Sequence, residues 1–216
     1  KEGADFGLGL DGDADRIGVM DEHGRLLFGD ELLSLFAREL LTRKPGATII
    51  GEVKCSHLMY KDIAEHGGNP LMWITGHSYI KAKMREIHAA LAGEMSGHIF
   101  FSDNWFGFDD GIYGAARFAD LFTAQDKPLS ALPGWPKTAK TPEISLPCPD
   151  AVKFAVVEKA QAYFRQKYEV SEIDGVRVIL PHGWGLVRAS NTQPALILRF
   201  EAETQEAMDA LRAEME

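Results

Sequence analysis

Three aspartates at alternating positions, Asp11, Asp13 and Asp15, form the most polar motif of the chain, LDGDADR, and Arg16 follows them directly. Carboxylate oxygens are the ligands that hard divalent cations prefer, and a curled loop can turn all three toward one ion. Magnesium is often completed by phosphate oxygens, and a guanidinium can bind the same phosphate. The motif therefore predicts a Mg²⁺ site at the three aspartates, with Arg16 facing a phosphate group.

Two other interpretations of this loop are a calcium-binding EF-hand and a solvated acidic turn. The three aspartates and Glu22 fall at positions 1, 3, 5 and 12 of an EF-hand loop, but position 6, which requires glycine, holds Arg16. The flanking sequences are typical of strands, whereas an EF-hand needs helices. Calcium binding is therefore disfavoured, and the acidic turn remains the alternative.

The composition of the 216 residues indicates a globular protein and argues against several classes of function. The formal net charge of −9, with 32 acidic against 23 basic side chains, disfavours broad nucleic-acid binding. No apolar run approaches the roughly 20 residues that cross a bilayer, and no signal peptide is recognisable. Cys55 and Cys148 lie far apart without a metal-binding pattern, which is typical of reduced thiols. We therefore expect a cytoplasmic protein without membrane or nucleic-acid partners.

The elements that must position the aspartate motif alternate between strand and helix patterns. Short strands are predicted on both sides of the motif, and an amphipathic helix capped by Asp30 follows over 31–46. Further elements are predicted as a strand over 47–53, a helix over 56–68, a strand over 70–75, a helix over 78–91, two strands within 92–101 and a helix over 109–124. Alternation of this kind predicts an α/β layer with a mostly parallel sheet.

A second unit is predicted beyond residues 127–142, where four prolines and no helical period indicate a linker. Its expected elements are a strand over 143–148, a helix over 151–166, strands within 174–190, a strand over 195–202 and a helix over 204–215. These make an α+β arrangement of about 75 residues, within the usual range for a domain. The predicted fold class is therefore α/β: a mixed α/β domain followed by a smaller α+β domain.

Two polar loops supply further candidate binding residues. In GEMSGH, Glu94 and Ser96 alternate, so on an extended stretch both would face one side and offer an acceptor and a donor to vicinal sugar hydroxyls, with His98 beside them. An ordinary tight turn is an equal alternative. In RASNTQP a guanidinium, two hydroxyls and an amide are packed together and could bind one anion, although such residues also form ordinary surface turns. These donors are Arg188, Ser190, Asn191 and Thr192.

Lys54 and His77 each follow a predicted strand, at the carboxyl ends where open α/β sheets bind their ligands. A single lysine or histidine there is more often structural, so position alone assigns neither a role. Tyr79 and Lys81 open the next helix and are not assigned to the site. The aromatic run WFGFDD is more typical of core or interdomain packing than of a stacking platform.

Three of these motifs resemble the loops of the α-D-phosphohexomutases, in the same order and at comparable intervals. DGDADR is similar to that family's metal-binding loop, GEMSGH at 93–98 to its sugar-recognition loop, and RASNTQP at 188–194 to its phosphate-binding loop. ITGHS at 74–78 and WFGFDDGIY at 105–113 extend the resemblance over essentially the whole chain.

The resemblance implies phosphoryl transfer between O1 and O6 of mannose or glucose through hexose 1,6-bisphosphate, with Mg²⁺ and a phosphoserine that donates and accepts the group. It implies that Arg16 faces the transferring phosphate and that Lys54 and His77 line the catalytic cleft, with His77 a candidate for proton transfer or phosphate contact.

The same resemblance assigns the substrate contacts. Glu94 and Ser96 are implied to hold the O3 and O4 hydroxyls of the sugar, and His98 is a further contact. The phosphate that is not being transferred is assigned to Arg188, Ser190, Asn191 and Thr192.

The family's phosphoserine lies in a TASHNP-type loop, and this sequence contains none, since Ser56-His57 in KCSHLM lacks the following Asn-Pro. The resemblance therefore implies a C-terminal portion: the end of domain 2 with the metal loop (1–27), domain 3 for sugar recognition (28–136) and domain 4 for phosphate binding (137–216). We expect it to be inactive alone, with hexose phosphates and the missing N-terminal domains as partners. The alternative is a non-catalytic sugar-phosphate binding module.

Overall fold

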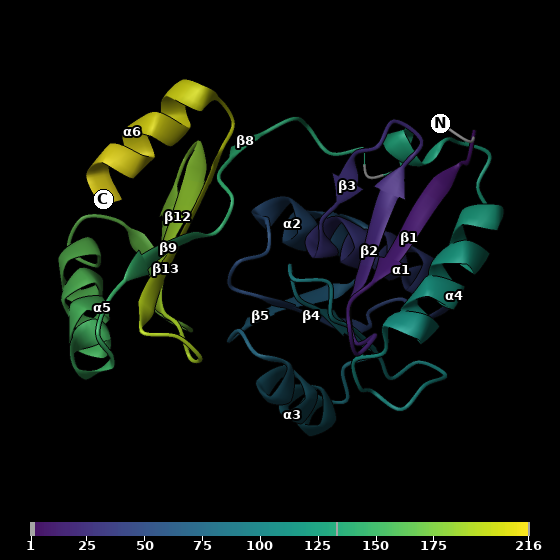
Figure 1. Cartoon of the computed structure of the whole chain (residues 1–216), viewed down its shortest axis with the longest axis horizontal. Helices are drawn as coiled ribbons and strands as arrows, with labels where there is room; N and C mark the ends of the chain where they lie inside the picture. Colours follow the sequence, from purple (N-terminus) through teal and green to yellow (C-terminus); the bar gives the residue numbers. More distant parts are fainter. Residues whose placement is uncertain (1–2, 133, 216) are drawn as a thin grey trace. The chain divides into compact units, whose positions relative to one another are not determined.

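The computed structural model describes residues 3–132 and 134–215, and the chain divides into two units at Trp135 and Pro136 (Figure 1). Each unit contains its own sheets and helices. The prediction of a mixed α/β domain followed by a smaller α+β domain is confirmed.

The stretch that the sequence predicted as a linker is structured on both sides of this division. Leu129 in the 3₁₀ helix η1 (Leu129–Ala131) is fully buried in the first unit, and the backbone N–H of Ser130 donates to Glu22 at 3.2 Å. On the other side, β8 (Ala139–Lys140) pairs with a strand of the second unit. The division between the two units falls within the predicted linker, and each end of that stretch contributes a short element to the unit that it adjoins.

The aspartate motif connects the first two strands of a small antiparallel sheet, as the sequence predicted. The three strands, in the order β1-β2-β3, are β1 (Phe6–Leu10), β2 (Ile17–Asp21) and β3 (Leu26–Leu27). Leu10 pairs with Ile17, so the loop leaves and re-enters the sheet at adjacent positions. This pairing closes residues 11–16 into a short loop whose polar side chains are crowded together.

The second sheet provides the strand ends that position the remaining polar loops of the first unit. It has the order β5-β4-β6-β7, in which β4 is parallel to β5 and β6 while β7 is antiparallel to β6. The strands are β4 (Thr48–Glu52), β5 (Asn69–Trp73), β6 (Leu91–Gly93) and β7 (Ile99–Phe101). The carboxyl ends of the three parallel strands therefore lie at one edge, which confirms the predicted mostly parallel arrangement.

Helices cover this sheet on both faces, and the alternation of side chains along β4 explains why. Ile49 packs in the core that contains Met59 of α2, whereas Ile50 packs with Ile80 and Met84 of α3. The four helices of the unit are α1 (Gly29–Arg43), α2 (His57–Glu65), α3 (His77–Ile87) and α4 (Gly111–Thr123).

Helix α1 begins two residues earlier than its sequence indicated. Asp30 is not the capping residue, because the helix starts at Gly29 and Phe28 occupies the N-cap position. The buried Asp30 carboxylate instead accepts a hydrogen bond from the backbone N–H of Ser56 at 2.8 Å. A Cβ at position 29 would lie only 2.1 Å from the carbonyl oxygen of Glu94, so glycine allows the start of α1 to pack against the GEMSGH loop.

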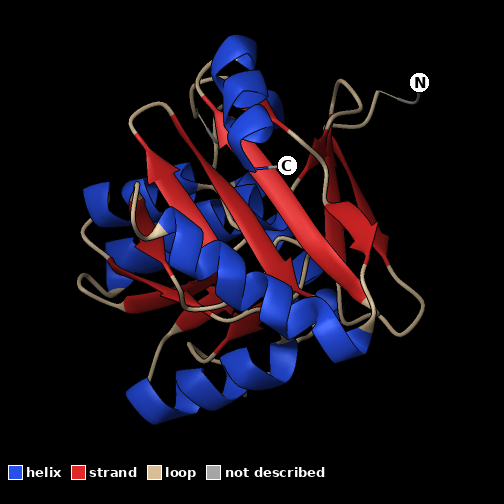
Figure 2. Ribbon diagram, turned by 90° about the vertical axis from the view of Figure 1, so that its left-hand side faces the viewer, coloured by secondary structure: helices blue, strands red, loops and turns tan. Residues whose placement is uncertain are grey.

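The second unit is an antiparallel sheet with both of its helices packed against it (Figures 1 and 2). The strand order is β10-β11-β12-β13-β8, with β9 also paired to β13. Apolar side chains from both helices share one core with the sheet. Besides β8, the elements are β9 (Ile144–Pro147), α5 (Asp150–Phe164), β10 (Glu169–Ser171), β11 (Val176–Leu180), β12 (Gly183–Ala189), β13 (Ala195–Ala202) and α6 (Gln205–Met215). The RASNTQP loop connects the two longest strands, β12 and β13. Within the described residues, no helix has the length and apolar character that a membrane span requires.

Candidate functional site

The three aspartates of the β1–β2 loop lie close enough to share one cation. One carboxylate oxygen from each of Asp11, Asp13 and Asp15 lies within 4.8 Å of the others. Among the described residues, Asp15 Oδ1 is buried and has no hydrogen-bond partner, as expected of an oxygen that serves as a metal ligand. The donor set is all oxygen, which suits a hard divalent cation. The loop therefore fits the Mg²⁺ ligand set that the sequence predicted.

The β1–β2 loop turns at a residue in the left-handed conformation, and a hydrogen bond from the start of α4 fixes it there. Ala14 has a φ of 60°, and its carbonyl oxygen accepts a hydrogen bond from the backbone N–H of Gly111 at 2.9 Å. A Cβ on residue 111 would lie 2.8 Å from that oxygen, so the first residue of α4 must be glycine for this contact.

The side chain of Arg16 forms ion pairs with two aspartates of its own loop. Its Nε lies 2.6 Å from Asp11 Oδ2 and 3.7 Å from Asp15 Oδ1, and the guanidinium remains half exposed. Desolvation opposes the ionisation of Asp11, but hydrogen bonds and the charge of Arg16 lower its pKa below the ordinary value. The arrangement supplies one fixed cation beside three carboxylates, and the predicted contact of Arg16 with a phosphate stays a prediction.

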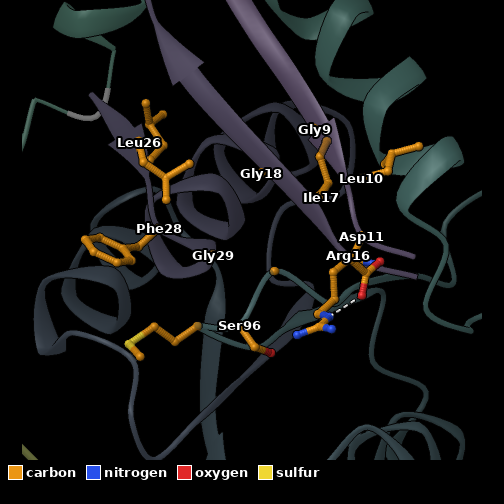
Figure 3. Close-up of a pocket in the computed structure, with 13 residues that line it drawn as sticks. Gly9, Leu10, Asp11, Arg16, Ile17, Gly18, Leu26, Phe28, Gly29 and Ser96 are labelled. Atoms are coloured by element: carbon orange, nitrogen blue, oxygen red, sulfur yellow. Dashed lines mark hydrogen bonds and ion pairs between the residues drawn. The ribbon is translucent and has the colours of Figure 1, made fainter. Parts of the chain in front are cut away.

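A pocket of about 310 Å³ lies beside this pair (Figure 3). Gly9 and Gly18 lie on paired strands at its edge, and Phe28 and Met95 add apolar surface. In Figure 3 the Arg16 guanidinium and the Ser96 hydroxyl point toward each other across one end of it. The pocket therefore joins the metal loop to the GEMSGH loop.

The GEMSGH loop is a tight turn and not the extended stretch on which the sugar-binding interpretation was based. The backbone N–H of Gly97 donates to the Glu94 carbonyl at 3.1 Å, and the N–H of Glu94 donates to the His98 carbonyl at 2.9 Å. Glu94 is buried, whereas Ser96 is exposed. The two side chains therefore differ in environment, because the turn returns the chain from β6 to β7 within a few residues.

Protein groups already contact both oxygens of the Glu94 carboxylate. Oε1 accepts from the backbone N–H of Gly76 at 2.7 Å, and Oε2 lies 2.7 Å from Nδ1 of His98. Burial opposes its ionisation, but the hydrogen bond to His98, that from Gly76 and the nearby charge of Lys54 together lower the pKa of Glu94. Burial likewise opposes protonation of His98, but Glu94 and the charges of Asp15 and Asp109 raise its pKa. Glu94 and His98 therefore form a hydrogen-bonded pair that the backbone of Gly76 anchors.

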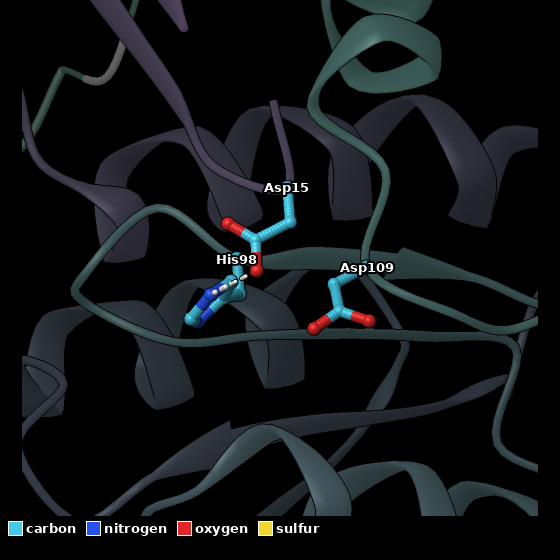
Figure 4. A group of neighbouring side chains, drawn as sticks. All are labelled: Asp15, His98 and Asp109. Carbon is cyan, nitrogen blue, oxygen red and sulfur yellow. Dashed lines mark ion pairs between the residues drawn. The ribbon is translucent and has the colours of Figure 1, made fainter. Parts of the chain in front are cut away.

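His98 connects the sugar-loop candidate to the metal-loop candidate (Figure 4). Its Nε2 lies 3.3 Å from Asp15 Oδ2, and its backbone forms a β-bridge with Arg16. Asp15, His98 and Asp109 each place one ligand atom within 4.8 Å of the others. Two loops that lie more than 80 residues apart in the chain thus meet at one imidazole.

His77 stands at the start of α3 and stacks on His98. The two ring centroids are 5.6 Å apart with an interplanar angle of 18°. Asp109 binds His77 Nδ1 and Lys81 Nζ, each at 2.7 Å. The sequence indicated His77 but missed Asp109 and Lys81. Asp109, the common partner of His77 and Lys81, lies in a loop about thirty residues further along the chain.

Glu52 is the residue that joins the loops at the strand ends, and it was also missed. It is fully buried, and its carboxylate accepts from the backbone N–H of Lys54 at 2.8 Å and from the Thr75 hydroxyl at 2.8 Å. It also accepts from the backbone N–H of Met95 at 3.2 Å. Lys54, itself buried, places Nζ 3.9 Å from the same carboxylate. One carboxylate therefore orients three loops that carry candidate site residues.

The aromatic run before α4 has two parts. Trp105 stacks on Tyr113 and packs against the main core, as predicted. Phe106 and Phe108 stack on each other but are exposed, Phe106 to 79%. The core prediction therefore holds for Trp105, whereas the two phenylalanines lie at the surface.

The RASNTQP loop of the second unit is organised around a buried arginine. Arg188 is the last residue but one of β12. Its side chain is 5% exposed, and its Nε donates to Asp174 Oδ2 at 2.9 Å. Its Nη2 is buried and lacks a hydrogen-bond partner among the residues that the structure describes. Asn191 and Thr192 are exposed beside it. A buried guanidinium with an unused donor fits an anion.

Two further groups fix this loop. The hydroxyl of Ser190 accepts from the backbone N–H of Gln193 at 3.1 Å. Lys153 of α5 is buried and donates to the carbonyl oxygens of Ser190 (2.6 Å) and Gln193 (3.0 Å). Lys153 gave no signal in the sequence, where it is one lysine of the predicted helix over 151–166.

Comparison with known proteins shows the family of the chain. Residues 28–137 match the family described as phosphoglucomutase/phosphomannomutase, alpha/beta/alpha domain III, and residues 143–216 match its C-terminal domain. The chain belongs to the phosphoglucomutase/phosphomannomutase family. The resemblance found in the sequence is thereby confirmed.

Relatives within this family are similar over nearly the whole chain. The phosphomannomutase/phosphoglucomutase of Pseudomonas syringae pv. tomato is 50% identical over 214 residues, which is 98% of this chain and 46% of the relative. The phosphoglucomutase of Neisseria gonorrhoeae is 46% identical over 97% of the chain and 46% of its own length. A phosphoglucomutase/phosphomannomutase family protein from Burkholderia thailandensis superposes with a TM-score of 0.90 at 45% identity, covering 97% of this chain and 45% of that one. The chain thus spans about half the length of these relatives.

Proposed function

We propose that this chain supplies the sugar-recognition and phosphate-binding portion of a Mg²⁺-dependent phosphohexomutase. The complete reaction would interconvert hexose 1-phosphate and hexose 6-phosphate, of mannose or glucose, through a bisphosphorylated sugar. The observation that carries the proposal is the buried Arg188 guanidinium with an unused donor in a loop of hydroxyl and amide groups. Family membership supports it. The buried cysteines Cys55 and Cys148 suit the proposed cytoplasmic location.

In this proposal the first unit binds the sugar and the reacting phosphate. Ser96 is exposed at the pocket and can donate to a sugar hydroxyl, and the anchored Glu94–His98 pair lies beside it. Arg16, Lys54 and His77 supply positive or proton-carrying groups nearby. Aspergillus fumigatus N-acetylphosphoglucosamine mutase, which has a similar fold, was solved with GlcNAc-6P and magnesium, and a variant of it was solved with glucose 1,6-bisphosphate. These ligands support a sugar phosphate as the substrate class.

Replacing Arg188 with alanine tests the phosphate-binding role. Glucose 1-phosphate, titrated into the chain by isothermal calorimetry, should bind at least tenfold more weakly to Arg188→Ala, because a charge-assisted hydrogen bond contributes about 1.5–3 kcal/mol.

Arg165→Ala is the matched control, since Arg165 lies in the same unit but is exposed and pairs only with Glu172 among the described residues. Its binding curve should equal that of the unchanged chain. If Arg188→Ala and Arg165→Ala bind glucose 1-phosphate with equal affinity, the RASNTQP loop does not bind the phosphate as proposed.

The Mg²⁺ site is part of the same proposal, with Asp11, Asp13 and Asp15 as its ligands. We expect weak Mg²⁺ binding by this chain, because three carboxylates leave the remaining positions to water or phosphate and Arg16 already holds Asp11. Arg16→Gln should strengthen Mg²⁺ binding in a calorimetric titration, and Asp13→Asn should weaken it. Tight, stoichiometric binding of Mg²⁺ by the unchanged chain would contradict this expectation. Tighter binding of Ca²⁺ than of Mg²⁺ would also contradict it.

A further inference from the structure

The carboxylate of Asp109 lies between two side chains of α3 that are one helical turn apart. Oδ2 is 2.7 Å from Nδ1 of His77, and Oδ1 is 2.7 Å from Nζ of Lys81. The Asp109 side chain is 8% exposed, whereas the imidazole of His77 is half exposed. The Asp109 carboxylate therefore binds the Nδ1 side of the His77 imidazole, and the other side of this ring faces the surface.

The backbone around Asp109 is fixed from three directions. Asp109 forms a β-bridge with Phe100, which lies two residues after His98. The next residue, Asp110, caps α4 by accepting from the backbone N–H of Tyr113 at 2.9 Å. The first residue of α4 is bonded to the metal loop through Ala14. Asp109 thus lies on a rigid support, as a group that orients another side chain requires.

The state of the His77 ring follows from the acceptor that it meets. Burial opposes ionisation of Asp109, but hydrogen bonds from Lys81 and His77 together lower its pKa, so the group is a carboxylate near neutral pH. A carboxylate only accepts hydrogen bonds, so Nδ1 must carry the proton. Lys81 Nζ also lies 3.4 Å from Nδ1, but this long contact cannot compete with a charge-assisted bond of 2.7 Å.

We propose that Asp109 is a positioning residue that holds neutral His77 as the Nδ1–H tautomer and so leaves Nε2 as its proton acceptor. The outward nitrogen is the one that a sugar hydroxyl or phosphate group can reach. The catalytic value of this arrangement rests on the proposed function. The tautomer itself does not, because it depends only on contacts within the first unit.

Asp109→Asn should reverse the tautomer without changing the shape of the site. Lys81 has only donors, so it takes the amide oxygen of the new side chain and leaves the amide NH₂ against His77. Nδ1 must then accept, and the proton moves to Nε2. In Lys81→Met/Asp109→Asn the amide can turn its oxygen to His77, so the Nδ1–H form should return in part.

Multiple-bond ¹H–¹⁵N correlation spectra of the ¹⁵N-histidine chain, recorded near pH 9, report the tautomer of each neutral ring. His77→Gln identifies the His77 signals. We expect the Nδ1–H form to exceed the other by about tenfold or more in the unchanged chain and in Lys81→Met. We expect the Nε2–H form to dominate in Asp109→Asn.

A predominantly Nε2–H ring in the unchanged chain overturns the proposal, whether or not the variants fold. An unchanged Nδ1–H ring in folded Asp109→Asn also overturns it, because a merely structural aspartate would leave the tautomer alone. If glucose 1-phosphate fails to bind while the tautomers behave as expected, the proposed function fails and the positioning role of Asp109 stands.

Discussion

Replacing Glu52 with leucine is expected to lower the free energy of unfolding of the chain by about 3–5 kcal/mol. The carboxylate is fully buried and accepts hydrogen bonds from the backbone of Lys54 and Met95 and from the Thr75 hydroxyl, so its removal takes away three buried hydrogen bonds and a negative charge close to the buried Lys54. Burial of an unsatisfied donor costs free energy that the added apolar contact cannot recover. Urea unfolding followed by circular dichroism measures the loss.

Two variants make this measurement specific. Glu52→Gln keeps the shape of the side chain and one acceptor oxygen. It should lose less stability than Glu52→Leu, because the remaining oxygen still accepts hydrogen bonds and only the donors that face the new NH₂ lose their acceptor. Glu65→Gln removes an exposed carboxylate from the same unit and should change the free energy of unfolding by less than about 0.5 kcal/mol. If Glu52→Leu unfolds at the same urea concentration as Glu65→Gln, the carboxylate does not hold the three loops together.

Lys153→Met is expected to lower the free energy of unfolding by about 3 kcal/mol and to weaken glucose 1-phosphate binding by roughly tenfold. The ammonium group is buried and donates to the carbonyl oxygens of Ser190 and Gln193, on either side of the exposed Asn191 and Thr192. Methionine fills similar volume but leaves both carbonyls without this donor. The loop should then lose the fixed backbone that orients its hydroxyl and amide groups.

Lys159→Met on the same helix is the matched control, because Lys159 is exposed. Its unfolding curve and binding curve should match those of the unchanged chain. Hydrogen exchange of the backbone amides of residues 190–193 separates the two effects, since loosening of the loop should raise exchange there first. Unchanged exchange and unchanged binding in Lys153→Met would remove Lys153 from the phosphate-binding machinery.

The sequence predicted best the clustering of candidate ligand groups that are close together in the chain. Asp11, Asp13 and Asp15 lie within five residues between two strands, so any turn short enough to join β1 and β2 brings their carboxylates together. The helices and strands followed equally from periodicity, because core-facing positions repeat at fixed intervals in each. The same reasoning did not foresee the burial of Leu129 and misplaced the start of α1, because contacts with distant residues decide both.

The sequence by itself thus determined the family, the order of the elements and the loops that carry polar groups, since all of these depend on residues close together in the chain. Only the tertiary structure decided which groups orient those loops. Glu52 and Met95 are 43 residues apart, Asp109 and His77 are 32 apart, and Lys153 and Ser190 are 37 apart. A buried charge obtains its partners from packing between elements, and no local pattern records which donor will lie within 3 Å of it.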